Sequence, residues 1–156
     1  MKAITIWQPW ASAIACGIKT IEVRKWRTDY RGRILIHAGQ KRDGSREAVR
    51  LAERLDALAV ALPTGVVVSV GEMTDCRRLI GKDETGACCV CVGLWGFILK
   101  DMTQLYNPVR CAGNYGLWVP SKRLVDRVSK SLEESNHLGQ QICPEPSTES
   151  LDSAVA

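Results

Sequence analysis

Short segments in which apolar and polar residues alternate are the feature that most constrains the fold of this sequence. In residues 19–26, KTIEVRKW, Ile21 and Val23 fall on one side of an extended chain, and Glu22, Arg24 and Trp26 fall on the other. This period predicts a strand with one buried face. Apolar runs bounded by turn residues predict further short strands at residues 2–7, 33–38, 65–76, 87–99 and 115–119.

Helical spacing is clearest in residues 46–62, where apolar residues recur every three or four positions after Ser45, a favourable N-cap. Shorter helices are predicted at residues 9–16, which are followed by Gly17, and at residues 121–132. Five or six short strands with one long helix and one or two short ones predict an α+β fold. We expect its sheet to be small, largely antiparallel and closed into a β-barrel.

The length of 156 residues suits one domain with a hydrophobic core. From residue 131 onward the chain has five acidic residues and no lysine or arginine, so we expect a domain at residues 1–130 and a flexible acidic tail at residues 131–156. No apolar run is long enough for a membrane helix, and the N-terminus does not resemble a signal peptide. These features predict a soluble protein of the cytoplasm.

Seven cysteines are present, and their spacing does not form the paired Cys-x-x-Cys or Cys/His arrangement of a zinc site. In a reducing compartment such cysteines behave as small hydrophobic residues. We therefore expect neither a metal site nor a cofactor.

Positive charge is concentrated at the start of the chain. Residues 1–50 contain 11 Lys or Arg and 4 Asp or Glu, and four of the nine aromatic residues fall within residues 1–30. Cations interleaved with flat rings favour a partner that carries phosphates and bases, which makes a nucleic acid or a nucleotide the expected ligand. The alternative is a solvated basic face above tryptophans that belong to the core.

Lys19, Glu22 and Arg24 are the main candidate site residues. Glu22 and Arg24 lie on the same strand face, about 7 Å apart along the strand. Lys19 has the opposite parity and can join them only from a turn after Gly17, where the chain is not yet extended. Together they would bind a phosphate, a base edge or an exocyclic amine. The alternative is a surface ion pair that contributes little stability.

Residues 8–39 resemble the ASCH (activating signal cointegrator homology) domain family. The shared features are Gln8-Pro9-Trp10, Gly17-x-Lys19-x-x-Glu22-x-Arg24, Tyr30-Arg31-Gly32 and His37-Ala38. The likeness continues through GVVVSVGEMTDC and NPVRCAGNYGLW, so it covers roughly residues 3–120.

This resemblance implies a β-barrel of the PUA-like superfamily with a cleft between the barrel and its helices, and RNA more than DNA as the partner. It also implies two catalytic alternatives. One relative hydrolyses the acetyl amide of acetylated cytidine with a lysine matching Lys19 and a threonine where this chain has Glu22, and another acts as a ribonuclease. Lys19 and Glu22 would be the catalytic residues of either activity, with Glu72 as a further carboxylate.

We therefore expect a binding module for RNA, single-stranded nucleic acid or a nucleotide. The alternatives are a small hydrolase and a protein-interaction adaptor, and no oligomeric state is predicted. Besides the Lys19, Glu22 and Arg24 trio, the expected ligand-binding residues are aromatic, basic or hydrogen-bonding side chains near the same strand: Gln8, Trp10, Trp26, Tyr30, Arg31, Arg33 and His37. Among these, Trp26 is the better candidate for stacking on a base, because it shares a face with Glu22 and Arg24.

Overall fold

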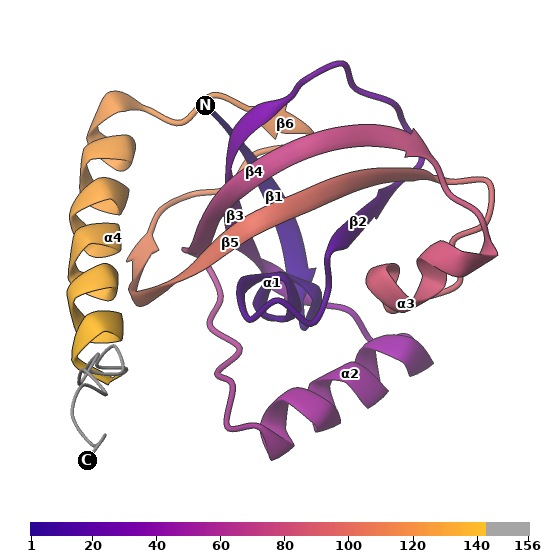
Figure 1. The fold of residues 1–156 in the computed structure, drawn as a ribbon, viewed down its shortest axis with the longest axis horizontal. Coiled ribbons are helices and arrows are strands. Elements are labelled where there is room, and N and C mark those ends of the chain that lie inside the picture. The colour runs from indigo at the N-terminus through magenta and orange to yellow at the C-terminus, as the bar shows by residue number, and fades with distance from the viewer. Residues whose placement is uncertain (143–156) are drawn as a thin grey trace, which may run out of the picture.

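A computed structural model describes residues 1–142 of the chain. Its elements, in chain order, are β1 (Lys2–Gln8), α1 (Trp10–Ala15), β2 (Ile21–Arg24), β3 (Gly32–Arg42), α2 (Arg46–Ala57), β4 (Val66–Arg78), a 3-10 turn (Gly81–Asp83), α3 (Glu84–Ala87), β5 (Trp95–Arg110), β6 (Leu117–Trp118) and α4 (Lys122–Ile142). Figure 1 shows α4 standing along one side of the curved sheet, with α1 and α2 near its other face.

The sheet has six strands in the order β2-β5-β4-β3-β1-β6. The β1–β3 pair is parallel and the other pairs are antiparallel, so the predicted α+β class is confirmed and the sheet is mixed. β2 and β6 form the two edges, and no backbone pairing joins them within residues 1–142. The expected closure into a barrel is therefore not seen in the strand pairing. A side chain spans part of the gap, because Arg24 Nη2 on β2 donates to the carbonyl of Thr5 on β1 at 3.0 Å.

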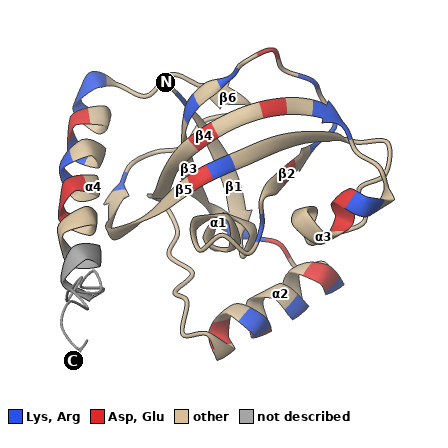
Figure 2. Cartoon of the chain, in the orientation of Figure 1, with Lys and Arg blue, Asp and Glu red and all other residues tan. Residues whose placement is uncertain are grey.

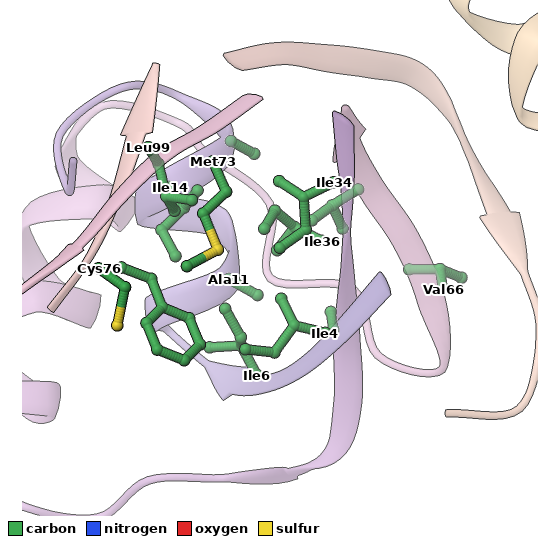
Figure 3. Packing of buried hydrophobic residues seen from close by; sticks show 14 residues of the cluster. Ile4, Ile6, Ala11, Ile14, Ile34, Ile36, Val66, Met73, Cys76 and Leu99 are labelled. Atoms are coloured by element: carbon green, nitrogen blue, oxygen red, sulfur yellow. The ribbon is translucent and has the colours of Figure 1, made fainter. Parts of the chain in front are cut away.

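β3 is buried on both faces over residues 34–39, which include its apolar segment Ile34-Leu35-Ile36. Ile34 and Ile36 pack with α1 and the concave side of the sheet, in the cluster shown in Figure 3. Leu35 packs in a second cluster, where Leu124 and Val128 of α4 cover the opposite side of the sheet. The sheet therefore lies between two apolar layers, and α4 belongs to one of them.

Helix α4 continues beyond the boundary predicted at residue 131. Ser131 is buried and its hydroxyl donates to the carbonyl of Asn107 at 2.6 Å, while Leu132 packs against the second cluster. Residues 131–142 are thus helical, where the sequence analysis placed the start of an acidic tail. The rest of that expected tail, residues 143–156, lies outside the described residues.

The predicted strand over residues 87–99 is wrong in its first half. Residues 88–94 form a loop, and β5 begins only at Trp95. Cys88 has a left-handed φ of 58°, outside the dihedral range of a regular extended chain. Cys91 is buried against Ile21 and Leu79, and burial raises the pKa of its thiol. The apolar run therefore includes a loop in which Cys91 is buried while Val90 and Val92 are exposed. Periodicity alone does not distinguish such a loop from a strand.

β5 also continues to Arg110, well beyond residue 99, where the predicted strand ends. Pro108 lies within this strand although it has no backbone N–H to donate. The pairing with β4 is irregular at that point, since Val67 faces Val109 while Ser69 faces Gln104. A bulge of this kind accommodates proline, because the bulged residues do not need to donate hydrogen bonds to the neighbouring strand.

The predicted long helix begins as expected and ends earlier. Ser45 accepts a hydrogen bond from the Ala48 N–H, and α2 then runs to Ala57. Ala59 adopts a φ of 55°, which stops the helix before residue 62. In residues 1–142, none of the helices combines the length and the hydropathy needed to cross a bilayer.

Asp83 should make folding sensitive to acid. Its carboxylate accepts two hydrogen bonds from Arg77, at 2.7 and 2.8 Å, and one from the Ile80 N–H at 2.9 Å. The Arg77 hydrogen bonds are the main cause of a pKa well below the ordinary range for Asp83. A carboxyl whose pKa falls on folding stabilises the protein above about pH 4 and loses that contribution as the pH falls further.

We expect Asp83→Asn to lower the thermal midpoint at neutral pH and to flatten its decline in acid. Thermal melts of both proteins from about pH 7 to about pH 2.5 would measure this, the upper limit lying well above the ordinary carboxyl pKa. Asp126→Asn is the control, because Asp126 pairs with Lys122 on the surface of α4. Identical pH profiles for wild type and Asp83→Asn would contradict the prediction.

Candidate functional site

Lys19 lies in the turn between α1 and β2, the position required by its parity. Gly17 leaves the helix with a φ of +77°, and the Lys19 N–H then donates to the Ala13 carbonyl at 3.0 Å. This bend directs the side chain inward, where Nζ donates to the Ala87 carbonyl at 2.6 Å. The ammonium lies 5.1 Å from the centroid of the Trp10 ring, within the range of a cation–π contact. Lys19 is only 2% exposed.

Glu22 connects the two cations of the trio. Its Oε2 lies 3.9 Å from Lys19 Nζ, and its Oε1 lies 3.1 Å from Arg24 Nε. The second contact is an ion pair rather than a hydrogen bond, since Arg24 Nε lacks a hydrogen-bond partner among the described residues. Glu22 is 7% exposed and Lys19 is 2% exposed, so two members of the trio lie inside the protein, and the Glu22–Arg24 contact is not the exposed surface pair considered as the alternative. Arg24 is also part of the lining of a surface cavity.

That cavity, which we call the Trp7 pocket, has a volume of about 600 Å³. Its walls come from β1, from the end of β3 and from the loop between β5 and β6, and they include Thr5, Trp7, Arg24, His37, residues 39–41 and residues 111–116. With Arg24 of β2, four segments that are separated in the sequence therefore form one depression.

The Trp7 pocket combines aromatic surface with positive charge. Trp7 is 48% exposed and Tyr115 is 98% exposed, although rings of this size usually pack inside a domain. Lys41 Nζ lies 5.7 Å from the centroid of the Trp7 ring, and no carboxylate of residues 1–142 lies within ion-pair distance of it. Arg24 adds a second cation to the same wall.

His37 lies at the base of the Trp7 pocket and is 2% exposed. Its Nε2 lies 3.2 Å from the Cys111 carbonyl, which can only accept, so Nε2 carries the proton of the neutral ring. Burial lowers the pKa of His37, and the Cys111 contact opposes this to a lesser degree. His37 is therefore neutral at pH 7. A Cβ at Gly113 would lie 2.6 Å from its Nδ1, so the loop can cover the ring only with glycine there.

Two other predicted ligand-binding residues, Gln8 and Trp10, make hydrogen bonds within the fold. Gln8 is fully buried; its amide donates to Ser12 Oγ and to the Pro63 carbonyl, both at 2.8 Å. Trp10 is half-buried and its Nε1 donates to Asp43 at 2.8 Å. These contacts join α1 to the segments on either side of α2, and neither residue lines the Trp7 pocket.

The remaining predicted residues lie apart from the Trp7 pocket. Trp26 is partly exposed and packs edge-on against Phe97, with ring centroids 5.0 Å apart. Arg31 pairs with Asp75 at 2.9 Å. Tyr30, Arg33 and Glu72 lie on or near the β3–β4 pair. The Tyr30 hydroxyl donates to the Arg33 carbonyl there. Glu72 is exposed and faces Arg33 across the strands, away from the Lys19 trio.

Sequence reasoning missed most of the Trp7 pocket. The ligand-binding residues expected from the sequence do not include Trp7, Lys41, Asn114 or Tyr115. The sequence signal for this loop is the glycine spacing of CAGNYG. Gly113 and Gly116 flank Asn114 and Tyr115, and this spacing indicates an exposed loop rather than a buried strand. Tyr115 next to a glycine with a φ of +63° is typical of an exposed loop tip.

Comparison with known proteins gives a consistent family. The family model described as the ASCH domain matches residues 4–129. Activating signal cointegrator 1 from Homo sapiens is 31% identical over 142 residues, and the Mus musculus protein is 25% identical over 142 residues. Each alignment covers 85% of this chain but 24% of the relative, so the chain spans about a quarter of the length of these curated proteins.

Among solved structures, the ASCH protein from Zymomonas mobilis superposes with a TM-score of 0.59 at 15% identity. The superposition covers 83% of this chain and 93% of that one. At this identity the likeness concerns the fold alone, and it agrees with the family match, which spans most of the described residues. The chain therefore belongs to the ASCH domain family.

Proposed function

We propose that this chain binds single-stranded nucleic acid, RNA in preference to DNA, by holding a nucleotide in the Trp7 pocket. The observation that carries the proposal is an exposed tryptophan with a lysine ammonium 5.7 Å from its ring, within one cavity, where the ammonium has no carboxylate partner among residues 1–142. Trp7 and Tyr115 offer flat surfaces for bases, and Lys41 offers a charge for a phosphate.

The volume of the pocket also suits such a ligand, because small-molecule sites commonly enclose 300–1,000 Å³. The Asn114 side-chain carbonyl accepts from the Tyr115 N–H at 2.8 Å, which leaves its amide NH₂ directed elsewhere. An amide donor of this kind can bond to a ribose hydroxyl, the group that distinguishes RNA from DNA. This agrees with the RNA partner that the family resemblance implies.

The geometry supports binding over hydrolysis. Lys19 is buried and donates to the Ala87 carbonyl, and Glu22 is held between two cations, so both of the expected catalytic groups serve interior contacts. Glu72 lies on the β3–β4 pair and does not line the Trp7 pocket. A pocket that presents rings and cations recognises a nucleotide without requiring chemistry.

Binding of a fluorescent single-stranded RNA should weaken steeply as salt increases, because phosphate contacts release counterions. We expect Lys41→Gln to weaken binding and to reduce the slope of log affinity against log salt by about 0.7, the value of one contact with a single strand. Fluorescence anisotropy across a salt series would measure both quantities. The same RNA and a DNA of equal sequence would test the preference.

Lys82→Gln is the matched control, since it removes an equal charge from the exposed turn before α3. Undetectable RNA binding at low salt would refute the proposal. Equal slopes for Lys41→Gln and Lys82→Gln would show that the Trp7 pocket is not the phosphate site.

A further inference from the structure

A second cavity, which we call the arginine groove, adjoins the Trp7 pocket. It has a volume of about 370 Å³ and lies where β5 ends beside the first turns of α4. Its lining includes Arg110, Arg123 and Arg127, with Ser121 at the start of the helix. Figure 2 shows Lys and Arg positions at this end of α4. Cys111 and Ala112 line both cavities, so the two depressions share a wall.

The three guanidinium groups of the groove have no acidic partner in the part of the chain that the structure describes. No carboxylate in residues 1–142 lies within ion-pair distance of them. Arg127 Nη1 donates to the Arg110 carbonyl at 3.0 Å, which fixes its position and leaves its other N–H donors available. Gathering three like charges in one groove is unfavourable unless an anion joins them. The groove is therefore arranged for an anionic ligand.

The start of α4 adds to this preference. Ser121 Oγ accepts from the Leu124 N–H at 3.3 Å and caps the helix, while the first backbone N–H groups carry the positive end of the helix dipole. Trp118 and Leu124 supply an apolar surface within the same groove. Guanidinium forks bind phosphate in a bidentate manner, and the apolar surface suits a sugar or a base.

We infer that the arginine groove is a phosphate subsite for the nucleic-acid strand that places one nucleotide in the Trp7 pocket. The ligand is then an oligonucleotide rather than a free nucleotide. This inference rests on the proposed function, because the shared wall at Cys111 and Ala112 has meaning only if one ligand occupies both cavities. A single-stranded oligonucleotide can bind both cavities at once, because its base can stack on the rings of the Trp7 pocket while its backbone phosphates contact the arginines of the groove.

The test compares a short single-stranded RNA with a mononucleotide, using wild type and the triple variant Arg110→Gln, Arg123→Gln and Arg127→Gln. We expect the triple variant to lower the salt slope for the oligonucleotide by about 2, which corresponds to three contacts on a single strand. Its affinity for the mononucleotide should remain within about twofold of wild type, because a mononucleotide does not extend into the groove.

The control removes three arginines from α2, which lies away from the groove (Figure 1), through Arg46→Gln, Arg50→Gln and Arg54→Gln. These residues are exposed, so the net charge changes equally without removing a contact to the groove. If the groove variant were to unfold, the single variant Arg123→Gln would replace it with an expected slope change of about 0.7, since Arg123 is exposed and makes no side-chain hydrogen bond within residues 1–142.

The outcomes separate the two proposals. If wild type binds both ligands and the groove variant behaves like the α2 variant, the phosphate subsite is refuted and the Trp7 pocket stands. An equal loss of mononucleotide and oligonucleotide affinity would likewise refute it. If wild type binds neither ligand, the proposed function fails and the subsite fails with it.

Discussion

Substitution of Glu22 by alanine should destabilise the fold by about 3–5 kcal/mol, the cost of removing one partner from a buried ion pair. Glu22 is the only carboxylate of residues 1–142 within ion-pair distance of Lys19, which is 2% exposed. Without it the ammonium would keep the Ala87 carbonyl and the face of Trp10, neither of which carries a net charge. Because single domains are stable by only 5–15 kcal/mol, such a loss is readily measured by urea denaturation.

The control is Asp29→Ala, which breaks the Arg27–Asp29 pair on the surface. Those side chains are 63% and 86% exposed, and pairs of this kind contribute about 0–1 kcal/mol. The double variant Lys19→Met with Glu22→Leu should recover much of the loss, since apolar residues of similar size often replace a buried pair without penalty. If Glu22→Ala were as mild as Asp29→Ala, the trio would not be a buried electrostatic unit.

Substitution of Trp7 by alanine should reduce affinity for single-stranded RNA by roughly 5- to 150-fold, which corresponds to the 1–3 kcal/mol that one stacked base contributes. The variant should fold normally, because Trp7 is 48% exposed and lies at the wall of a cavity rather than in an apolar cluster. Trp7→Tyr should restore most of the affinity by keeping a ring. Fluorescence anisotropy with labelled RNA would measure all three proteins.

Trp26→Ala should have the opposite effect to Trp7→Ala, lowering stability rather than RNA affinity. Trp26 packs against Phe97, so its loss should lower the thermal midpoint while leaving the affinity of the folded protein unchanged. The sequence favoured Trp26 for stacking because it shares a strand face with Glu22 and Arg24. A larger loss of affinity from Trp26→Ala than from Trp7→Ala would contradict the assignment of the Trp7 pocket.

Local pattern predicted the strands and helices that carry clear signals. The alternation around Glu22, the Ser45 cap and the buried run through Ile34 all correspond to structure. The strand predicted over residues 87–99 began too early and ended too early, because a loop with one buried cysteine and a strand that continues through a bulge both depend on the segments that pack beside them. Local sequence pattern also could not predict whether the sheet closes into a barrel, because closure depends on whether the two edge strands pair with each other.

The site was predicted in part. Parity and the glycine at position 17 were enough to bring Lys19 to Glu22 and Arg24, but they could not show that two of these side chains would be buried. The burial of Lys19 and Glu22 depends on the loop at residues 88–94 and on α3. The Ala87 carbonyl of α3 accepts the hydrogen bond from the Lys19 ammonium. The Trp7 pocket joins residues more than 70 positions apart, and a single sequence contains no signal for that contact.

Arg24 links the buried Glu22 to the Trp7 pocket, because its guanidinium contacts both the Glu22 carboxylate and the carbonyl of Thr5. An anion entering the pocket must compete with these two acceptors before it can draw Arg24 toward itself. The net attraction of Arg24 for a ligand is therefore weaker than its charge implies, and Lys41 should provide more of the selectivity. Energetic coupling is reciprocal, so any ligand that does engage Arg24 will loosen the hold of Glu22 in the interior.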